Sequence, residues 1–284
     1  MSNLLSGPRT WAGFLRVLMA LLVGSLLAGC QSPREALQQL ADAHVRQLEI
    51  LPGQPFPLAM LPPQSATKVN RLRVYLEGDG HAWATATQPS LDPSPHNLLV
   101  ARLAVDDPTP NAYLARPCQF VVAPACEPSL WTHRRFSQEV VTSLSQALDQ
   151  LKQQYGNREF ELVGYSGGAA LALLLAAQRD DVSLVQTLAG NLSPRLWAEM
   201  KGLSPLGGSL DPLDYRDRLA STPQRHLVGD ADNVVPESLA KAYIARLPPY
   251  ACSQVVVSSA TDHQQGWGPV WRKWRDKPPN CKSN

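Results

Sequence analysis

The sequence lacks the patterns that mark several common classes of binding protein. It contains no phosphate loop and no flavin motif, and the four cysteines after Cys30 show no zinc-site spacing. Asp230-Ala231-Asp232 begins like a calcium loop, but the oxygen ligand and the glycine that must follow are missing. We therefore expect no cofactor and no bound metal.

The chain also lacks a large net charge and an internal repeat. It has 26 basic and 24 acidic residues, for a formal charge of +2. Arg9 and Arg16 lie in a segment that we expect to be removed, which leaves 24 residues of each sign. A neutral chain does not attract polyanions, so we expect no nucleic acid partner. With 284 residues and 44% apolar content, the chain can bury one large core.

What the sequence does contain is the segment Gly164-Tyr165-Ser166-Gly167-Gly168 in an informative context. A strand-like run precedes it at residues 160–163, and a strong helix former follows it at residues 169–177. A G-x-S-x-G pattern between a strand and a helix is typical of a nucleophile elbow, a sharp turn that exposes its serine. The helix N-terminus also favours negative charge near Ser166. The alternative is an ordinary turn with an inert serine.

A nucleophilic serine needs a base, and the sequence offers six histidines. Four of them precede Ser166 and two follow it: His44, His81, His96 and His133, then His226 and His263. His226 opens an apolar, strand-like stretch. His263 follows the β-branched run at residues 254–257, which we predict to be the last strand.

The candidate acids lie in one loop, from Gly229 to Pro236. This loop follows a strand predicted at residues 224–228 and precedes a helix predicted at about residues 236–247. A carboxylate here can hold the histidine ring in the required tautomer and stabilise its protonated form. Asp230 and Asp232 both qualify.

Together these motifs resemble the α/β-hydrolase superfamily, from about residue 69 to the C-terminus. The resemblance implies a mostly parallel sheet flanked by helices and catalytic residues in the order serine, acid, histidine. That order selects His263. In such hydrolases the aspartate commonly lies in a Gly-x-x-Asp-x-x-Val-Pro pattern, which selects Asp232 and leaves Asp230 as a turn-forming residue. The expected catalytic residues are therefore Ser166, Asp232 and His263.

The resemblance also implies an oxyanion hole made of two backbone N–H groups. One belongs to Gly167, and the other comes from the loop after a strand predicted at residues 71–76. In that loop we expect the N–H of Asp79, with Gly80 as the second choice. Glu77 stands where many relatives carry a histidine, and two carboxylates oppose an oxyanion unless they are paired or point away. Four arginines are candidate partners: Arg71, Arg73, Arg134 and Arg135.

The N-terminus carries a targeting pattern. An uncharged apolar stretch at residues 17–26 is too short to span a bilayer and is typical of a signal-peptide core. It ends in Leu27-Ala28-Gly29-Cys30, which resembles the bacterial lipobox, so we expect a lipoprotein signal peptide at residues 1–29 and lipid on Cys30. Gln31 is not the aspartate of inner-membrane retention, which favours the outer membrane. The alternative is a soluble periplasmic protein that is cleaved nearby.

More narrowly, the chain resembles uncharacterised α/β-hydrolase lipoproteins of Gram-negative bacteria. We expect a lipidated segment and spacer at residues 30–68 and the hydrolase domain at residues 69–284. Within the first, helix-like spacing predicts a helix at residues 33–51, near the membrane. The proline-rich residues 52–64 are interpreted as a spacer or a strap over the sheet.

Cysteine usage agrees with an oxidising compartment. Without Cys30 four cysteines remain, and an even number in the cell envelope suggests two disulfides. Four cysteines allow three pairings. The simplest is the local one, which joins Cys118 to Cys126 and Cys252 to Cys281.

Residues 84–131 form a long stretch that is rich in proline, aspartate and asparagine. It exceeds the usual length of a connection, which suggests a function. We interpret it as an irregular insertion in which a loop closed by Cys118 and Cys126 forms a pocket wall, with Trp83 and Trp131 at the rim. Irregular surface packing is the alternative.

Two classes of function fit these observations. The first is a membrane-anchored serine hydrolase that cleaves a carboxylic ester, thioester or amide of a small-molecule or acyl substrate, through an acyl-enzyme on Ser166. The second is a catalytically silent envelope lipoprotein that uses the fold for binding or scaffolding. The complete ordered set of serine, aspartate and histidine favours the enzyme.

Overall fold

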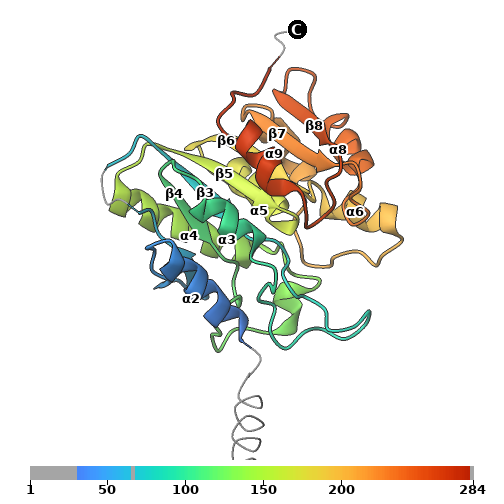
Figure 1. Ribbon diagram of the computed structural model, residues 1–284. Helices are drawn as coiled ribbons and strands as arrows, with labels where there is room; N and C mark the ends of the chain where they lie inside the picture. Colours follow the sequence, from blue (N-terminus) through green and yellow to red (C-terminus); the bar gives the residue numbers. More distant parts are fainter. Residues whose placement is uncertain (1–30, 65–67, 282–284) are drawn as a thin grey trace, which may run out of the picture.

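The computed structural model describes residues 31–64 and 68–281 (Figure 1). At its centre lies an eight-stranded sheet with the order β1-β2-β4-β3-β5-β6-β7-β8. The strands are β1 (Glu49–Leu51), β2 (Leu58–Leu61), β3 (Arg71–Leu76), β4 (Asn111–Leu114), β5 (Glu159–Tyr165), β6 (Val182–Leu188), β7 (Gln224–Gly229) and β8 (Ser253–Ser258). Strand β2 is antiparallel to β1 and β4, and all other neighbours are parallel. The predicted class, a mostly parallel α/β fold, is confirmed.

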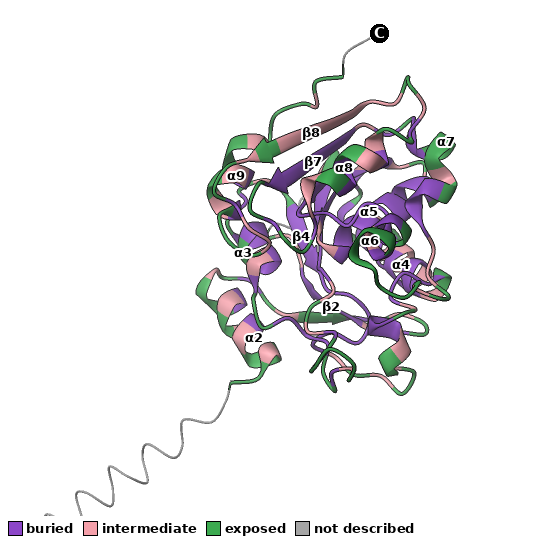
Figure 2. Ribbon diagram, turned by 90° about the vertical axis from the view of Figure 1, so that its right-hand side faces the viewer, coloured by how far each residue is buried: buried purple, intermediate pink, exposed green. Residues whose placement is uncertain are grey.

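Helices cover both faces of this sheet (Figure 2). They are α2 (Pro33–Ala43), α3 (Leu99–Val105), α4 (Gln138–Tyr155), α5 (Gly167–Gln178), α6 (Pro194–Lys201), α7 (Arg216–Leu219), α8 (Glu237–Ile244) and α9 (Trp267–Trp274), with 3₁₀ turns η1 (Pro128–Trp131) and η2 (Pro212–Tyr215). Apolar residues of α2, α3 and α9 form the core on one face. Those of α4, α5, α6, α7 and α8 belong to the core on the other face.

The alternation of side chains along β3 shows how one strand serves both cores. Leu72 and Val74 pack in the α4–α5 core, whereas Tyr75 packs in the α2–α3–α9 core, as the two-residue period of a strand requires. Helix α5 differs from the surface helices because it is buried from Gly167 to Ala177 and apolar on all sides. The turn between β5 and α5 is therefore held at both ends by buried elements.

The sequence predictions for four strands of the parallel part of the sheet are confirmed. Residues 71–76, 160–163, 224–228 and 254–257 lie in β3, β5, β7 and β8. The helix predicted after Ser166 is α5, and the helix predicted at about residues 236–247 is α8. These segments combine β-branched or apolar runs with clear turn residues, so local pattern and tertiary structure agree.

The prediction of one helix at residues 33–51 is wrong. Helix α2 begins with a capping box at Ser32 and Glu35, ends at Ala43, and is followed by the edge strand β1. Residues 58–61, expected in a spacer or strap, form the buried strand β2. A boundary at residue 69 therefore divides a single sheet, because β2 pairs with β4 through Met60 and Leu61.

Residues 84–131 are only partly irregular. They contain α3 and β4, and β4 pairs in parallel with β3 from Asn111 to Leu114. Helix α3 and strand β4 thus complete a strand–helix–strand crossover that begins with β3, before this stretch. The helix has 7 residues and the strand 4, which is too short for periodicity to reveal either.

The targeting predictions concern residues that the structure does not describe. The signal peptide at residues 1–29 and the lipidation site Cys30 lie outside the described residues. Among residues 31–64 and 68–281, no helix has both the length and the apolar character needed to cross a bilayer.

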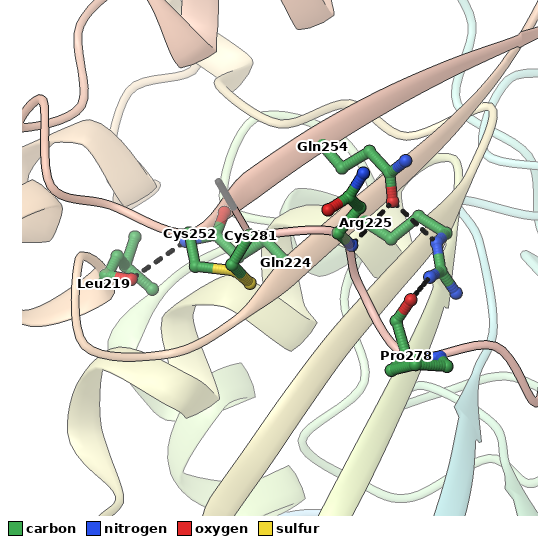
Figure 3. Close-up of a disulfide and its surroundings, with 8 residues drawn as sticks. Leu219, Gln224, Arg225, Cys252, Gln254, Pro278 and Cys281 are labelled. Carbon is green, nitrogen blue, oxygen red and sulfur yellow. Dashed lines mark hydrogen bonds between the residues drawn. A yellow bond between two sulfur atoms is a disulfide. The ribbon is translucent and has the colours of Figure 1, made fainter. Parts of the chain in front are cut away.

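The four cysteines lie in the two local pairs expected from the sequence. The Cα atoms are 5.7 Å apart for Cys118–Cys126 and 5.0 Å apart for Cys252–Cys281. Figure 3 shows the second pair beside Arg225, which donates hydrogen bonds to the carbonyl of Pro278 (2.6 Å) and to Oε1 of Gln254 (3.3 Å). The disulfide and this buried arginine together hold the C-terminal segment against β7 and β8.

We predict that the two disulfides stabilise the fold unequally. The loop-entropy model gives about 2.5 kcal/mol for the Cys118–Cys126 pair, separated by 8 residues, and about 3.5 kcal/mol for the Cys252–Cys281 pair, separated by 29. Cys281→Ser should therefore lower the free energy of unfolding by about 1 kcal/mol more than Cys126→Ser. Urea unfolding of both variants and of the reduced parent tests this. A larger loss in Cys126→Ser would contradict it.

Candidate active site

Ser166 lies at the tip of the turn between β5 and α5. Its backbone has φ 50° and ψ −120°, a conformation that costs a non-glycine residue on the order of 1–3 kcal/mol. Three hydrogen bonds hold it: its N–H donates to Leu188 (3.1 Å), and its carbonyl accepts from Ala169 (3.1 Å) and Asn191 (2.9 Å). The predicted elbow is therefore present, and its backbone is fixed by β6 and the segment after it.

Two glycines make this sharp turn possible. A Cβ atom on Gly164 would collide with the backbone of Gly168 and Ala169. One on Gly168 would collide with the carbonyl groups of Leu76 and Glu77, at the end of β3. Only glycine allows these backbones to approach so closely. The second contact brings the loop after β3 directly against the elbow.

The structure brings together the three side chains that the sequence singled out. Oγ of Ser166 lies 3.0 Å from Nε2 of His263, and Nδ1 of His263 lies 2.8 Å from Oδ2 of Asp232. These residues come from the ends of β5, β7 and β8 in the parallel part of the sheet, where β6 lies between β5 and β7. A continuous hydrogen-bonded line from a hydroxyl through an imidazole to a carboxylate is the arrangement that activates a serine.

Asp232, and not Asp230, faces the histidine. The Asp232 side chain is fully buried, and its Oδ1 accepts hydrogen bonds from the N–H groups of Val234 and Val235, both at 2.8 Å. This leaves Oδ2 for His263. Asp230 is exposed and donates its backbone N–H to Ser258 (3.1 Å), so it serves the turn.

The loop that carries His263 is held by two aromatic residues that the sequence reasoning did not single out. Tyr165 donates its hydroxyl hydrogen bond to the carbonyl of His263 (2.8 Å), and Nε1 of Trp267 donates to the carbonyls of Asp262 (2.9 Å) and His263 (3.2 Å). Tyr165 directly precedes the serine and Trp267 opens α9. The signal in the sequence was the residue type, because the hydroxyl of a tyrosine and the ring N–H of a tryptophan usually find a hydrogen-bond partner when the ring is buried.

His226 lies in β7, as its apolar surroundings predicted. It is buried, with Nδ1 2.9 Å from Oγ1 of Thr187 and Nε2 3.2 Å from Oε1 of Gln224. Burial lowers its pKa to about 3, so the ring stays neutral. Its hydrogen bonds are to these neutral side chains, whereas His263 bonds Ser166.

The loop after β3 carries the two carboxylates that the sequence placed near the oxyanion hole. Glu77 is buried, and it accepts hydrogen bonds from the backbone N–H of Gly78 and the hydroxyl of Tyr113, both at 2.8 Å. Burial raises the pKa of Glu77 to about 7, because few charges compensate it there. Burial therefore disfavours the charged form of Glu77.

Asp79 is paired with two arginines. Arg116 donates from Nη1 to Oδ1, and Arg135 donates from Nη1 to Oδ2 (2.8 Å). Burial alone would raise the pKa of Asp79, but the charges of Arg135 and Arg116 hold it below its ordinary value. Arg135 was among the expected partners, whereas Arg116, within the 84–131 stretch, was missed.

The other three candidate arginines pair elsewhere. Arg71 bonds Glu159, Arg73 bonds Glu161 and Asp107, and Arg134 bonds Glu127 and Glu139.

The backbone N–H groups expected to form the oxyanion hole are unoccupied by protein acceptors. Neither Gly167 nor Asp79 donates its N–H to any residue within the described ranges. The two residues are in contact, because a Cβ on Gly167 would collide with the carboxylate of Asp79. Both residues therefore lie at the elbow, and neither backbone N–H is used by an acceptor among the described residues.

A cavity of about 550 Å³ opens onto Ser166 and His263. Its wall includes Trp83, as expected, and residues 95–97 of the long stretch after β3. The loop closed by Cys118–Cys126 does not line it, so the proposed role of that loop as a pocket wall is wrong. Trp131 is also not at the rim: it is buried, and its Nε1 donates to the carbonyl of Ser90 (3.1 Å).

A second cavity, of about 490 Å³, lies at the amino-terminal ends of the strands. It is bordered by Arg73, whose guanidinium is bound by Asp107, Glu161 and Asp276. No serine–histidine pair lies there. No group of three or more histidine, cysteine or acidic side chains suited to a metal occurs in the part of the chain that the structure describes.

Comparison with known proteins gives structural matches and no sequence matches. No protein-family model matches the sequence, and no curated protein matches it. A solved α/β serine hydrolase homologue from Coxiella burnetii aligns with a TM-score of 0.54 and 14% identity, over 80% of this chain and 93% of its own. Est1E from Butyrivibrio proteoclasticus aligns with a TM-score of 0.54 and 14% identity, over 80% and 94%.

An esterase from Pyrococcus furiosus aligns over 88% of this chain and 93% of its own, with a TM-score of 0.57 and 10% identity. At such low identity the likeness concerns the arrangement of strands and helices, which agrees with the resemblance stated from the motifs. The chain therefore has the α/β-hydrolase fold.

Proposed function

We propose that this protein is a serine hydrolase that cleaves a carboxylic ester, or a thioester or amide, through an acyl-enzyme on Ser166. The observation that carries the proposal is the line of hydrogen bonds from Oγ of Ser166 to Nε2 of His263 (3.0 Å) and from Nδ1 of His263 to Oδ2 of Asp232 (2.8 Å). The neighbours with hydrolase and esterase names support the same class of reaction.

In the proposed mechanism His263 is the general base. Its Nε2 takes the hydroxyl proton while Oγ of Ser166 attacks the carbonyl carbon of the substrate. The negative oxygen that develops is stabilised by the N–H groups of Gly167 and Asp79, which have no acceptor among the residues that the structure describes. His263 then returns the proton to the leaving group, and a water molecule that it activates hydrolyses the acyl-enzyme.

Asp232 orients and stabilises the histidine in this proposal. Its Oδ2 accepts the proton of Nδ1, which leaves the lone pair on Nε2 facing Ser166. The N–H groups of Val234 and Val235 hold the other oxygen, so the carboxylate cannot rotate away. A buried carboxylate at this position stabilises the imidazolium that forms during attack.

We further propose that the mature protein is anchored to the outer membrane through lipid on Cys30. The support is the sequence Leu27-Ala28-Gly29-Cys30 after an uncharged apolar stretch, with Gln31 following. Three or more acyl chains hold a protein far more firmly than a single chain does. The function that competes with the serine hydrolase is a catalytically silent scaffold, and covalent labelling of Ser166 distinguishes these two functions.

Ser166→Ala should abolish covalent labelling by a fluorophosphonate probe and hydrolysis of short nitrophenyl esters. The reason is that the variant lacks the only hydroxyl within hydrogen-bond reach of Nε2 of His263 among the described residues. Gel fluorescence and ester turnover measure the two effects, and circular dichroism checks the fold. Full labelling of Ser166→Ala would refute the assignment, and an unlabelled parent protein would favour the silent scaffold.

Asp232→Asn should lower kcat by roughly 10⁴-fold, because an amide at this position favours the wrong tautomer of His263. Asp230→Asn is the matched control, since Asp230 lies two positions away and is exposed. We expect it to retain nearly all activity. Steady-state kinetics on one ester compares the two variants. Loss of activity in Asp230→Asn together with retained activity in Asp232→Asn would overturn the proposed role of Asp232.

Cys30→Ser should release the protein from membranes without loss of hydrolysis, because the anchor precedes α2, the first described helix. Fractionation and mass spectrometry of the N-terminus provide the measurement. The parent protein should begin at Cys30 and carry lipid. An unmodified N-terminus in the parent would show that the protein is not a lipoprotein and would leave the catalytic proposal untouched.

A further inference from the structure

Two buried arginines lie beside one wall of the active-site cavity. The side chains of Arg116 and Arg135 are 5% and 7% exposed, and they share the single carboxylate of Asp79. Glu77, the other carboxyl on this wall, accepts its hydrogen bonds from Tyr113 and Gly78 and not from either arginine. Burial raises the pKa of Glu77 to about 7, which disfavours its ionised form. A buried charge without a full partner is unfavourable unless a ligand supplies one.

Arg135 is the arginine of this pair that lines the cavity. Its Nη1 donates to Asp79, whereas its Nη2 and Nε donate to no acceptor within the described residues. Arg116, by contrast, also donates from Nη2 to the carbonyl of Arg135. Arg135 is thus the cation with unused hydrogen-bonding capacity at the site.

Aromatic rings fix Arg135 in place. Its guanidinium carbon lies 5.7 Å from the ring centre of Phe136 and 5.7 Å from that of Trp197. Trp197 is itself held, because its Nε1 donates to the carbonyl of Val234 (2.9 Å). A guanidinium already held in position loses little conformational freedom when it binds an anion.

The rest of the lining combines aromatic, small apolar and polar side chains. Trp83, Trp197 and Val234 border the cavity, and no leucine, isoleucine, methionine or phenylalanine is among the described residues that do. The lining also carries His81 and His96, with ring centres 4.7 Å apart in a stacked arrangement, and Asn97 follows them. A cavity with such mixed walls favours a short substrate that carries a polar group.

We propose that Arg135 binds a carboxylate carried by the substrate, so that the preferred substrates are short anionic esters and not long-chain lipid esters. This inference rests on the proposed hydrolase function. Nη2 of Arg135 supplies a charge-assisted hydrogen bond to the carboxylate, while Nη1 stays bound to Asp79. The anion gives Arg135 a second partner. Asp232 does not oppose it directly, because its carboxylate is buried behind His263.

The test compares matched pairs of esters that differ by one negative charge. On the acyl side, the pair is the 4-nitrophenyl monoester of succinic acid and its methyl ester. On the alcohol side, the pair is 4-carboxyphenyl acetate and methyl 4-acetoxybenzoate. For the mature protein we expect kcat/KM to be at least about 10-fold higher for the anionic member of one pair, mainly through KM. Equal turnover within both pairs would overturn the inference.

Variants then test whether Arg135 causes the preference for the anionic ester. Arg135→Gln should remove it, Arg135→Lys should keep part of it, and Arg134→Gln is the matched control because Arg134 pairs with Glu127 and Glu139, away from the cavity. If Arg135 only positions Asp79, Arg135→Gln will slow the anionic and neutral esters equally. That result would also overturn the inference, although the hydrolase proposal would stand.

A measurement on the unaltered protein covers the case in which Arg135→Gln fails to fold. Monomethyl succinate should slow fluorophosphonate labelling of Ser166 at concentrations at least about 10-fold lower than dimethyl succinate does, and added salt should weaken this protection. If both compounds protect Ser166 equally and the protein is still labelled, the anion site is refuted and the hydrolase proposal stands. A protein that is not labelled at all refutes the hydrolase proposal and this inference together.

Discussion

The constraint on which the rest of the site depends is the close contact between the elbow and the loop after β3. Gly168 lies against the carbonyl groups of Leu76 and Glu77, and Gly167 lies against the carboxylate of Asp79. Any side chain at either glycine would separate the two loops. Because the backbones touch, the serine, the helix N-terminus behind it and the free N–H of Asp79 occupy one small region. The proposed oxyanion hole follows from that steric fit.

The same contact creates an electrostatic problem, since it brings two carboxylates to the place where negative charge develops in the proposed mechanism. The structure answers it in two ways. Burial raises the pKa of Glu77 to about 7, which disfavours its charged form. Asp79 stays ionised but is bound by two guanidinium groups. The second arrangement leaves Arg135 at the cavity with a hydrogen-bond donor that Asp79 does not use. In the proposed reaction, an oxyanion and an anionic substrate both benefit from this cation.

The two ends of the sheet carry different kinds of polar structure. At the carboxyl ends of the strands, Ser166, Asp232 and His263 are linked by hydrogen bonds, and Ser166 and His263 border a cavity. At the amino ends, Arg73 and Arg225 are surrounded by carboxylates and by carbonyls of the C-terminal segment. The disulfide Cys252–Cys281 closes that segment against the same end (Figure 3). The ion pairs of Arg73, the hydrogen bonds of Arg225 and this disulfide thus hold the fold at the end of the sheet away from the candidate site. Polar groups at the candidate site are left free to bind a ligand.

The sequence revealed most where a motif or the family resemblance marked a residue. The elbow and the strands β3, β5, β7 and β8 rest on local pattern, the choice of Asp232 over Asp230 rests on the resemblance to α/β-hydrolases, and the structure places these residues as expected. Arg116 was missed because its partner Asp79 lies 37 positions away and no motif marks the pair. Short strands such as β1, β2 and β4 were missed because 3 or 4 residues carry no period. Their pairing is decided by burial in the sheet, a tertiary effect that overrides local preference. The electrostatic character of the cavity arises from such distant pairs, so it follows from the folded structure and not from any single motif.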